Sequence, residues 1–383
     1  LTRWSVDHDV LVDLERHGRS DLADLSRTAD LSRTTGWFTS IAPVRLRPGT
    51  DPVTVLAETK EALRAAPDGG LGYGLLRYGN ARTAALLARG EQSQILLNYL
   101  GRVPAAGSAP FDRAPETVRT DPDADMGGPY RLVINAHVTD GEQPTLSAQF
   151  AWSSAHLSSE AITSLTDEFR TALGDLAEAA RTHDGPPILT PSDVPLVDVT
   201  PDELTALTAQ GSVEMVWPLT PLQEGLVFES LSAGERDIYT AQFALDFDHR
   251  LDLDRLRSAL AGLQRRHPQL RAGFTQTAAG VPVQVVSSSC EVPVREAHAG
   301  DDDEAERWMQ EDRDTPFDLS TPPLWRVLVL HLAGERDRLV INRQFLVWDG
   351  WSNGVVVGEL LARYENPGLP APADTAFERY LTW

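Results

Sequence analysis

The chain has 383 residues, of which 42% are hydrophobic, so it can bury a sizeable core and is long enough for about two domains. Its formal net charge of −22 argues against nonspecific nucleic-acid binding, because the phosphate backbone would be repelled over the whole surface. Cys290 is the only cysteine, which excludes an internal disulfide and any cysteine-based metal cluster.

The ends and the hydropathy of the chain bear on its location. Its apolar runs fall short of the roughly 20 residues that cross a bilayer, and the N-terminus lacks a basic start and a hydrophobic signal core. We therefore expect a cytoplasmic protein without membrane contact. Leu1 is not an initiator methionine and Trp383 closes an unfinished amphipathic stretch, so we also expect a segment of a longer polypeptide.

Strands and helices alternate in the first block. β-Branched and aromatic content predicts strands at 36–46, 94–99, 131–138 and 146–152. Helical spacing of apolar residues predicts helices at 51–66 and 158–180, the second opened by serine. A Pro, Asp and Gly-rich stretch, 107–128, is interpreted as a long surface loop.

The second block repeats this style. Strands are predicted at 240–247, 281–286, 325–332 and 338–347, and helices at 252–267, 301–312 and 352–364. A further helix is predicted to begin behind Pro218 and Pro221. The fold class is therefore α/β (α+β), with helices packed on one face of a mixed, largely antiparallel sheet in each lobe.

Between the blocks the composition changes. Residues 183–216 contain the breakers G-P-P, T-P-S-D-V-P and T-P-D-E, which cannot form one continuous element. We predict two lobes, 1–185 and 216–383, joined by a linker at 186–215. A short helix at 201–209, capped by Thr200, interrupts the linker.

Four sequence words follow one another in the first block. They are L-E-R-H-G-R (14–19), S-R-T-T-G-W-F-T-S-I-A-P-V (32–44), P-D-G-G-L-G-Y-G (67–74) and N-Y-L-G (98–101). Together they resemble the C-terminal half of an epimerization domain of a nonribosomal peptide synthetase. The resemblance implies conversion of an L-aminoacyl or peptidyl thioester to its D-epimer. The linker word T-P-S-D-V-P-L resembles the segment that usually follows such a domain.

The second block resembles the N-terminal half of a condensation domain. The words are P-L-T-P-L-Q-E-G (218–225), R-R-H-P-Q-L-R-A-G-F (265–274), P-P-L-W-R-V-L (322–328) and D-G-W-S (349–352). The resemblance implies chloramphenicol-acetyltransferase-like lobes and a place in antibiotic biosynthesis. It also implies substrates carried on the 4′-phosphopantetheine of peptidyl carrier protein domains, neighbouring synthetase domains as partners, and no cofactor bound directly.

The catalytic motif of the condensation family is altered. Members carry H-H-x-x-x-D-G, whose second histidine stands beside the attacking amine, where an imidazole of pKa near 6.5 can accept a proton. The register of Asp349 and Gly350 puts Gln344 and Phe345 at the histidine positions, and neither can accept a proton. We therefore predict loss of condensation chemistry, either in a degenerate domain that keeps its fold or in a site repurposed to recruit a carrier protein or a tailoring enzyme.

The neighbours of this motif are assigned structural roles. The resemblance implies that Asp349 pairs with an arginine, for which Arg271 and Arg343 are the candidates. Trp348 and Trp351 are interpreted as core or lobe-interface residues, with ligand stacking as the alternative. His267 is interpreted as a cap or surface residue.

Glu15 is the chemical candidate of the first block. It matches the glutamate of the epimerization motif E-G-H-G-R-E, where a carboxylate can reprotonate the α carbon. His17 is positioned in sequence to orient it, while Arg16 and Ser20 depart from the motif. The alternative is a solvated charge near a turn. The histidine motif of that domain would lie before residue 1, so we expect this chain alone not to assemble the site.

Other classes lack support in the sequence. A free-standing acyltransferase of this fold would need the intact histidine motif. The phosphate-binding word G-x-x-x-x-G-K-S/T, a dinucleotide-binding glycine fingerprint and zinc-ligand spacing are absent. The acidic run 301–306 is typical of a solvated helix start.

Overall fold

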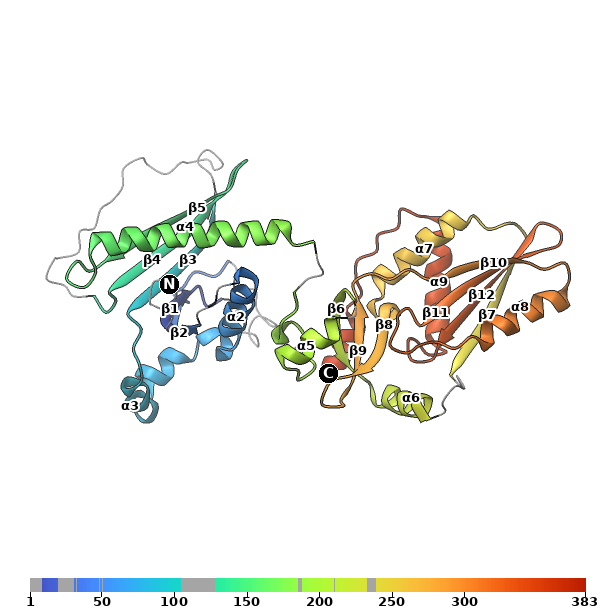
Figure 1. Ribbon diagram of the computed structural model, residues 1–383, viewed down its shortest axis with the longest axis horizontal. Helices are drawn as coiled ribbons and strands as arrows, with labels where there is room; N and C mark the ends of the chain where they lie inside the picture. The colour runs from blue at the N-terminus through green and yellow to red at the C-terminus, as the bar shows by residue number, and fades with distance from the viewer. Residues whose placement is uncertain are drawn as a thin grey trace. The chain divides into compact units, whose positions relative to one another are not determined.

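The computed structural model describes residues 9–19, 31, 33–47, 49, 51–104, 128–184, 188–209, 211–232 and 239–383. The chain divides into two compact units, Leu1–Asp184 and Gly185–Trp383, which are described separately (Figure 1). The loop predicted at 107–128 lies, apart from Gly128, outside the described residues.

A five-stranded mixed sheet in the order β2-β1-β3-β4-β5 forms the centre of the first unit. Its strands are β1 (Val10–Arg16), β2 (Ser40–Leu46), β3 (Ile95–Val103), β4 (Leu132–Thr139) and β5 (Thr145–Trp152). The outer pairs β1–β2 and β4–β5 are antiparallel, whereas β3 runs parallel to both β1 and β4. β1 was not predicted as a strand.

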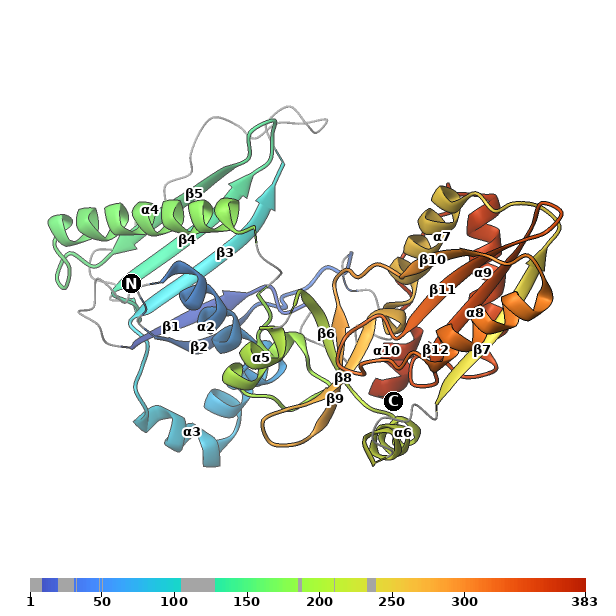
Figure 2. The same ribbon diagram turned by 45° about the vertical axis from the view of Figure 1, so that its right-hand side comes forward.

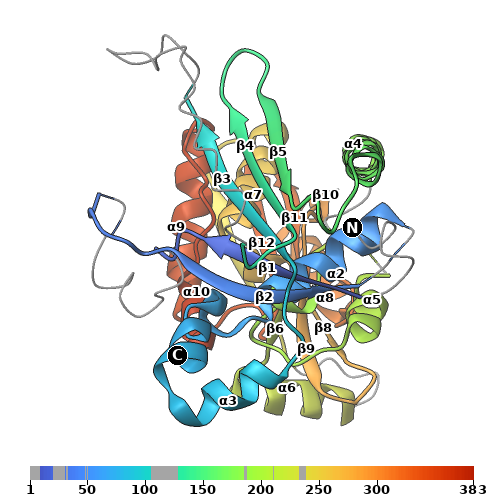
Figure 3. The same cartoon turned by 90° about the vertical axis from the view of Figure 1, so that its left-hand side faces the viewer.

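Helices α2 (Pro52–Arg64) and α4 (Ser159–Thr182) lie on one side of this sheet (Figure 3). Ile162 and Leu165 of α4 pack on Leu132 and Ile134 of β4. Ser158 caps α4 as predicted, because its hydroxyl accepts a hydrogen bond from the backbone N–H of Ala161 at 3.2 Å. Three short elements follow α2: a 3-10 turn (Pro67–Gly70), a π-helical turn (Leu75–Gly79) and α3 (Ala81–Arg89).

The second unit contains two sheets. One has the order β10-β11-β12-β7 and the other the order β6-β9-β8. Their strands are β6 (Val213–Pro218), β7 (Thr240–Phe247), β8 (Ala272–Gln276), β9 (Pro282–Ser287), β10 (Val294–His298), β11 (Trp325–Leu332) and β12 (Arg336–Gln344). The helices are α5 (Pro201–Thr208), α6 (Pro221–Ser232), α7 (Leu253–Arg266), α8 (Asp302–Asp314), α9 (Ser352–Glu365) and α10 (Ala376–Thr382), with 3-10 turns at Pro191–Asp193 and Pro268–Arg271.

Helices cover both faces of the four-stranded sheet, where the sequence predicted one covered face. Val327 and Val329 of β11 share a core with Leu260 of α7 and Leu360 of α9. Leu328 and its neighbours on the other face pack on Ala305 of α8 (Figure 2). β11 is almost continuously apolar because both of its faces are buried.

The segment predicted as a linker is folded. Val194, Leu204 and Val213 are buried in one cluster with Val283 of β9. β6 extends the small sheet by antiparallel pairing with β9. The predicted helix is present as α5, where Thr200 and Glu203 form a reciprocal capping box. Residues 188–216 therefore belong to the second unit.

The predicted secondary structure agrees with the observed one in kind, and antiparallel pairs outnumber parallel pairs as expected. β12 ends at Gln344, three residues before the predicted end at Val347, because 345–347 form a turn. Among the described residues, no helix is long and apolar enough to cross a membrane.

Candidate functional site

The turn from β12 into α9 carries the residues that the sequence register assigns to the histidine motif. Gln344 is the last residue of β12 and is 1% exposed. Its side-chain oxygen accepts a hydrogen bond from the backbone N–H of Phe345 at 2.9 Å. The Gln344 side chain thus satisfies a backbone donor at the point where β12 ends.

Phe345 covers a buried cation. The ring of Phe345, 41% exposed, lies 4.7 Å from the guanidinium of Arg343, and the ring of Trp348 lies 5.0 Å from it on centroid distances. Arg343 is 2% exposed and donates a hydrogen bond to the Trp348 carbonyl. Burial lowers the pKa of Arg343, and the charge of Asp349 opposes this shift. The two rings therefore hold the cation where little water reaches it.

Asp349 holds the start of α9. Its Oδ1 accepts hydrogen bonds from the hydroxyl of Ser352 at 2.7 Å and from the backbone N–H of Ser352 at 2.8 Å. These bonds, and more weakly the charge of Arg343, lower the pKa of the Asp349 carboxyl. Gly350 follows in the turn, where a Cβ would meet open space.

Asp349 does not form the predicted ion pair with an arginine. Within the described part of the chain, no arginine nitrogen lies within 4 Å of its carboxylate. Arg271 is instead buried beside Glu214, with Nη1 2.7 Å from Glu214 Oε2. Arg343 acts on Asp349 only through its charge.

A cavity of about 570 Å³ opens beside this turn. Its walls come from α6, the turn Pro268–Arg271, the β12–α9 turn, α9 and α10. Leu222, Val355 and Tyr380 are exposed apolar parts of the wall. The fold thus joins three of the separate sequence words at one cavity, which local patterns could not show.

The other candidates of the second unit have structural contacts. Trp348 is buried and packs edge-on against Trp325, with ring centroids 5.6 Å apart, whereas Trp351 is 90% exposed. His267, buried at the end of α7, has its Nε2 3.2 Å from Glu359 Oε2.

Glu15 lies in β1 of the first unit. It is opposite Ile41 of β2 and Asn98 of β3, and it is half-buried. The other carboxylate of this strand, Asp13, accepts a hydrogen bond from the hydroxyl of Tyr130 at 2.8 Å. Burial and this bond raise the pKa of Tyr130. Glu15 has no side-chain hydrogen bond among the described residues, so its carboxylate is the uncommitted one.

The residues around Glu15 fix the strand end. Gly18 has φ +64°, and a Cβ there would lie 1.9 Å from the Phe38 carbonyl oxygen. Arg16 donates from Nη2 to the Leu63 carbonyl of α2 at 3.0 Å. His17 is exposed and accepts from the Arg19 backbone N–H at 3.1 Å, so it does not orient Glu15 as predicted. Ser20 lies outside the described residues.

The structure brings Gln344, Phe345 and Asp349 together in the second unit and places Glu15 in the first. In the described part of the chain, no group of three or more His, Cys, Asp or Glu side chains could hold a metal ion.

The model of the condensation domain family matches residues 1–191 and 213–383. The chain belongs to the condensation-domain family. A linear gramicidin synthase protein from Brevibacillus parabrevis is 32% identical over 401 residues, covering 100% of this chain and 8% of that protein. Chondramide synthase cmdD from Chondromyces crocatus is 30% identical over 442 residues, covering 99% of this chain and 11% of that protein. The chain thus spans a small part of each relative and is a condensation-domain segment of the kind found in nonribosomal peptide synthetases.

One solved structure, the first condensation domain of the CDA synthetase, is similar with a TM-score of 0.38 and 23% identity. The similarity covers 43% of this chain and 43% of that one.

Proposed function

We propose that this segment lies at the junction of an epimerization domain and a condensation domain. The segment handles aminoacyl or peptidyl thioesters carried on the 4′-phosphopantetheine of carrier domains in the cytoplasm. The order of the sequence words supports this assignment. The condensation site is inactive, and the observation that carries this part is the Phe345 ring stacked on Arg343 where the family has an imidazole.

No group described at the β12–α9 turn can act as a general base. Phe345 has no titratable group, and the Gln344 amide is neutral and bonded to its own backbone neighbour. An arginine remains protonated even when its pKa falls from the usual value. Asp349 has a lowered pKa and is bonded to Ser352, so it is a poor proton acceptor. His267, which also lines the cavity, is buried with its Nε2 3.2 Å from Glu359 Oε2. The two motif positions therefore offer the attacking amine no base.

Glu15 supplies one of the two proton-transfer groups of epimerization. Its carboxylate is free of hydrogen bonds among the described residues, unlike that of Asp13. The resemblance assigns the second group, an imidazole, to the histidine motif of the epimerization domain. Carrier domains and neighbouring synthetase domains are the proposed partners.

Chirality of the carrier-bound product tests this proposal. In a synthetase module that contains this chain, Glu15→Gln should lower the rate of D-residue formation about 100-fold or more, because a proton donor and acceptor is lost. Glu142→Gln, in the exposed turn before β5, is the matched control and should leave the rate unchanged. Unchanged D-residue formation in Glu15→Gln would refute the role of Glu15.

A recruitment platform is the second candidate. The exposed apolar wall of the 570 Å³ cavity, including Leu222 and Val355, favours it. A carrier domain or a tailoring enzyme is the expected partner. If the platform operates, Leu222→Asp should weaken the binding of a purified carrier domain to this chain. Equal affinity of the carrier domain for the unchanged chain and for the variant would contradict the recruitment role.

A further inference from the structure

A buried glutamine joins α6 to the β12–α9 turn. Gln223 is 9% exposed, and its Nε2 donates a hydrogen bond to the backbone carbonyl of Leu346 at 2.9 Å. Its Oε1 accepts hydrogen bonds from the backbone N–H of Thr220 at 2.9 Å and from Nε2 of Gln284 at 3.1 Å. Gln223 therefore connects the start of α6 and the small sheet to the residue that follows Phe345.

The turn combines a buried part and an exposed ring. Leu346, Val347 and Trp348 are buried in the core of the four-stranded sheet. The backbone N–H of Phe345 donates to the carbonyl of Tyr239 at 2.9 Å, and the two rings meet edge-on with centroids 6.5 Å apart. The Phe345 ring is still 41% exposed, so it is the part of the turn with room to move.

The arginine under this ring is a buried cation without a carboxylate partner. Within the described residues, no carboxylate oxygen lies within 4 Å of the Arg343 guanidinium, and its Nε has no hydrogen-bond partner. Two other buried arginines of the unit are paired: Arg271 with Glu214 at 2.7 Å and Arg326 with Asp312 at 3.3 Å. Burial of an unpaired charge is unfavourable, so Arg343 opposes the closed arrangement of the turn.

Phe345 separates this cation from the cavity of about 570 Å³. The Phe345 ring lines the cavity and Arg343 does not. The described lining residues include the carboxylates Asp349 and Asp374 but no lysine or arginine. Displacement of the Phe345 ring would give the cavity a guanidinium. The conformation of the turn therefore decides which charges the cavity presents.

We propose that Gln223 is a positioning residue that keeps the β12–α9 turn closed, with the Phe345 ring over Arg343, and that the turn also opens toward the cavity. One hydrogen bond to a carbonyl and two ring contacts compensate the buried charge only in part. Leu222, the neighbour of Gln223, is 72% exposed, so a protein that binds α6 would act beside this bond. The two conformations do not depend on whether the site forms peptide bonds or the first unit forms D-residues.

Labelling of the 383-residue chain with phenylglyoxal, which modifies accessible arginine side chains, tests this role. Mass spectrometry of proteolytic peptides gives the labelling rate of each arginine. Gln223→Glu keeps the acceptor for Thr220 and Gln284 but loses the donor to Leu346, and Gln223→Leu loses both. Each variant should raise the labelling rate of Arg343 about three- to tenfold, because a hydrogen bond that closes the turn is lost.

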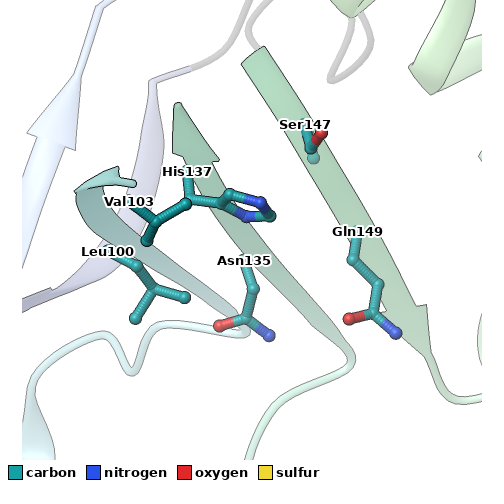
Figure 4. A pocket seen from close by; sticks show the side chains of 7 residues that line it. Leu100, Val103, Asn135, His137, Ser147 and Gln149 are labelled. Carbon is teal, nitrogen blue, oxygen red and sulfur yellow. The ribbon is translucent and has the colours of Figure 1, made fainter. Parts of the chain in front are cut away.

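Arg271 and Arg326 are internal references, since both are buried in the same unit and paired with carboxylates. Their labelling rates should stay unchanged in both variants. Gln149→Leu is the matched control in the first unit, where Figure 4 shows this glutamine on the wall of a separate cavity of about 270 Å³. Gln149 is exposed and has no side-chain hydrogen bond within the described part of the chain. Its replacement should leave the labelling rate of Arg343 unchanged.

Phe345→Ala removes the ring itself and should raise the labelling rate of Arg343 at least as much as the changes at Gln223. An unchanged Arg343 rate in both Gln223 variants would overturn the positioning role. A rise shared equally by Arg343, Arg271 and Arg326 would also overturn it, because it would show general unfolding of the unit. An unchanged Arg343 rate in Phe345→Ala would show that the ring does not control access to the cation.

Discussion

At the scale of single residues, the β12–α9 turn shows how the side chains at the proposed histidine positions pack. Phe345 and Trp348 enclose the Arg343 guanidinium, and Asp349 is left to hold Ser352. The sequence register predicts that Gln344 and Phe345 occupy the histidine positions, and the side chains of both residues lack a proton acceptor. It could not show the stacking, because that depends on how the turn after β12 folds back.

The turn at Gly18 gives a prediction at this scale. Its φ of +64° and the 1.9 Å approach of a Cβ to the Phe38 carbonyl leave no room for a side chain. Gly18→Ala should destabilise the first unit by about 2 kcal/mol or more. Gly72→Ala, where a Cβ meets open space, is the control and should change stability little. Thermal unfolding of both variants measures the difference, and equal melting temperatures would contradict the strain.

At the scale of elements, the segment 186–215 shows the limit of local patterns. Its prolines predicted a linker between the lobes, which is wrong because the segment is folded into the second unit, whereas the short helix predicted within it is present as α5. The partner of Val194, Leu204 and Val213 is Val283, far away in the sequence. β6 pairs with β9, which lies far away in the sequence, so no local sequence pattern predicts this pairing. The second helix-covered face of the large sheet was missed for the same reason.

Asp337 links the start of β12 to the segment before α7. Its carboxylate is buried and accepts hydrogen bonds from the backbone N–H of Leu251 at 2.7 Å, from Arg250 at 2.6 Å and from His331 Nδ1 at 2.8 Å. Burial would raise the pKa of Asp337, but these donors together outweigh it and lower the pKa.

This contribution to stability has a defined pH dependence. Because the folded pKa lies below the unfolded value of about 3.9, the contribution is complete above that pH and is lost as the pH falls through the folded pKa. Asp337→Asn should cost about 3 kcal/mol at pH 7 and less in acid, where the unchanged protein loses the same interaction. Urea unfolding at pH 7 and in acid measures the free energy of unfolding of the unchanged chain and of Asp337→Asn. Asp198→Asn, which removes a carboxylate outside this cluster, is the control. A stability difference between the unchanged chain and Asp337→Asn that grows in acid would contradict the predicted sign.

At the scale of the whole molecule, the chain has two units with separate cores. The sequence words predicted both, and the family model matches a stretch in each. The boundary lies at 184/185 rather than at both ends of a free linker.

Two fragments test this division. Residues 185–383 contain the cluster around Val283 and should unfold in one cooperative transition. Residues 216–383 lack Val194, Leu204 and Val213, and burial of three such side chains contributes several kcal/mol, so this fragment should melt at a clearly lower temperature. Equal melting temperatures in calorimetry would show that 185–215 behaves as a linker after all.

The central claim is that the β12–α9 turn does not catalyse peptide-bond formation. The most direct measurement supplies a module containing this chain with loaded donor and acceptor carriers and follows the acceptor by intact-protein mass spectrometry. We predict that no peptide forms at this site, with or without Phe345→Ala, because neither motif position carries a base. A peptide product that forms in the unchanged module and disappears in Phe345→Ala would contradict the claim.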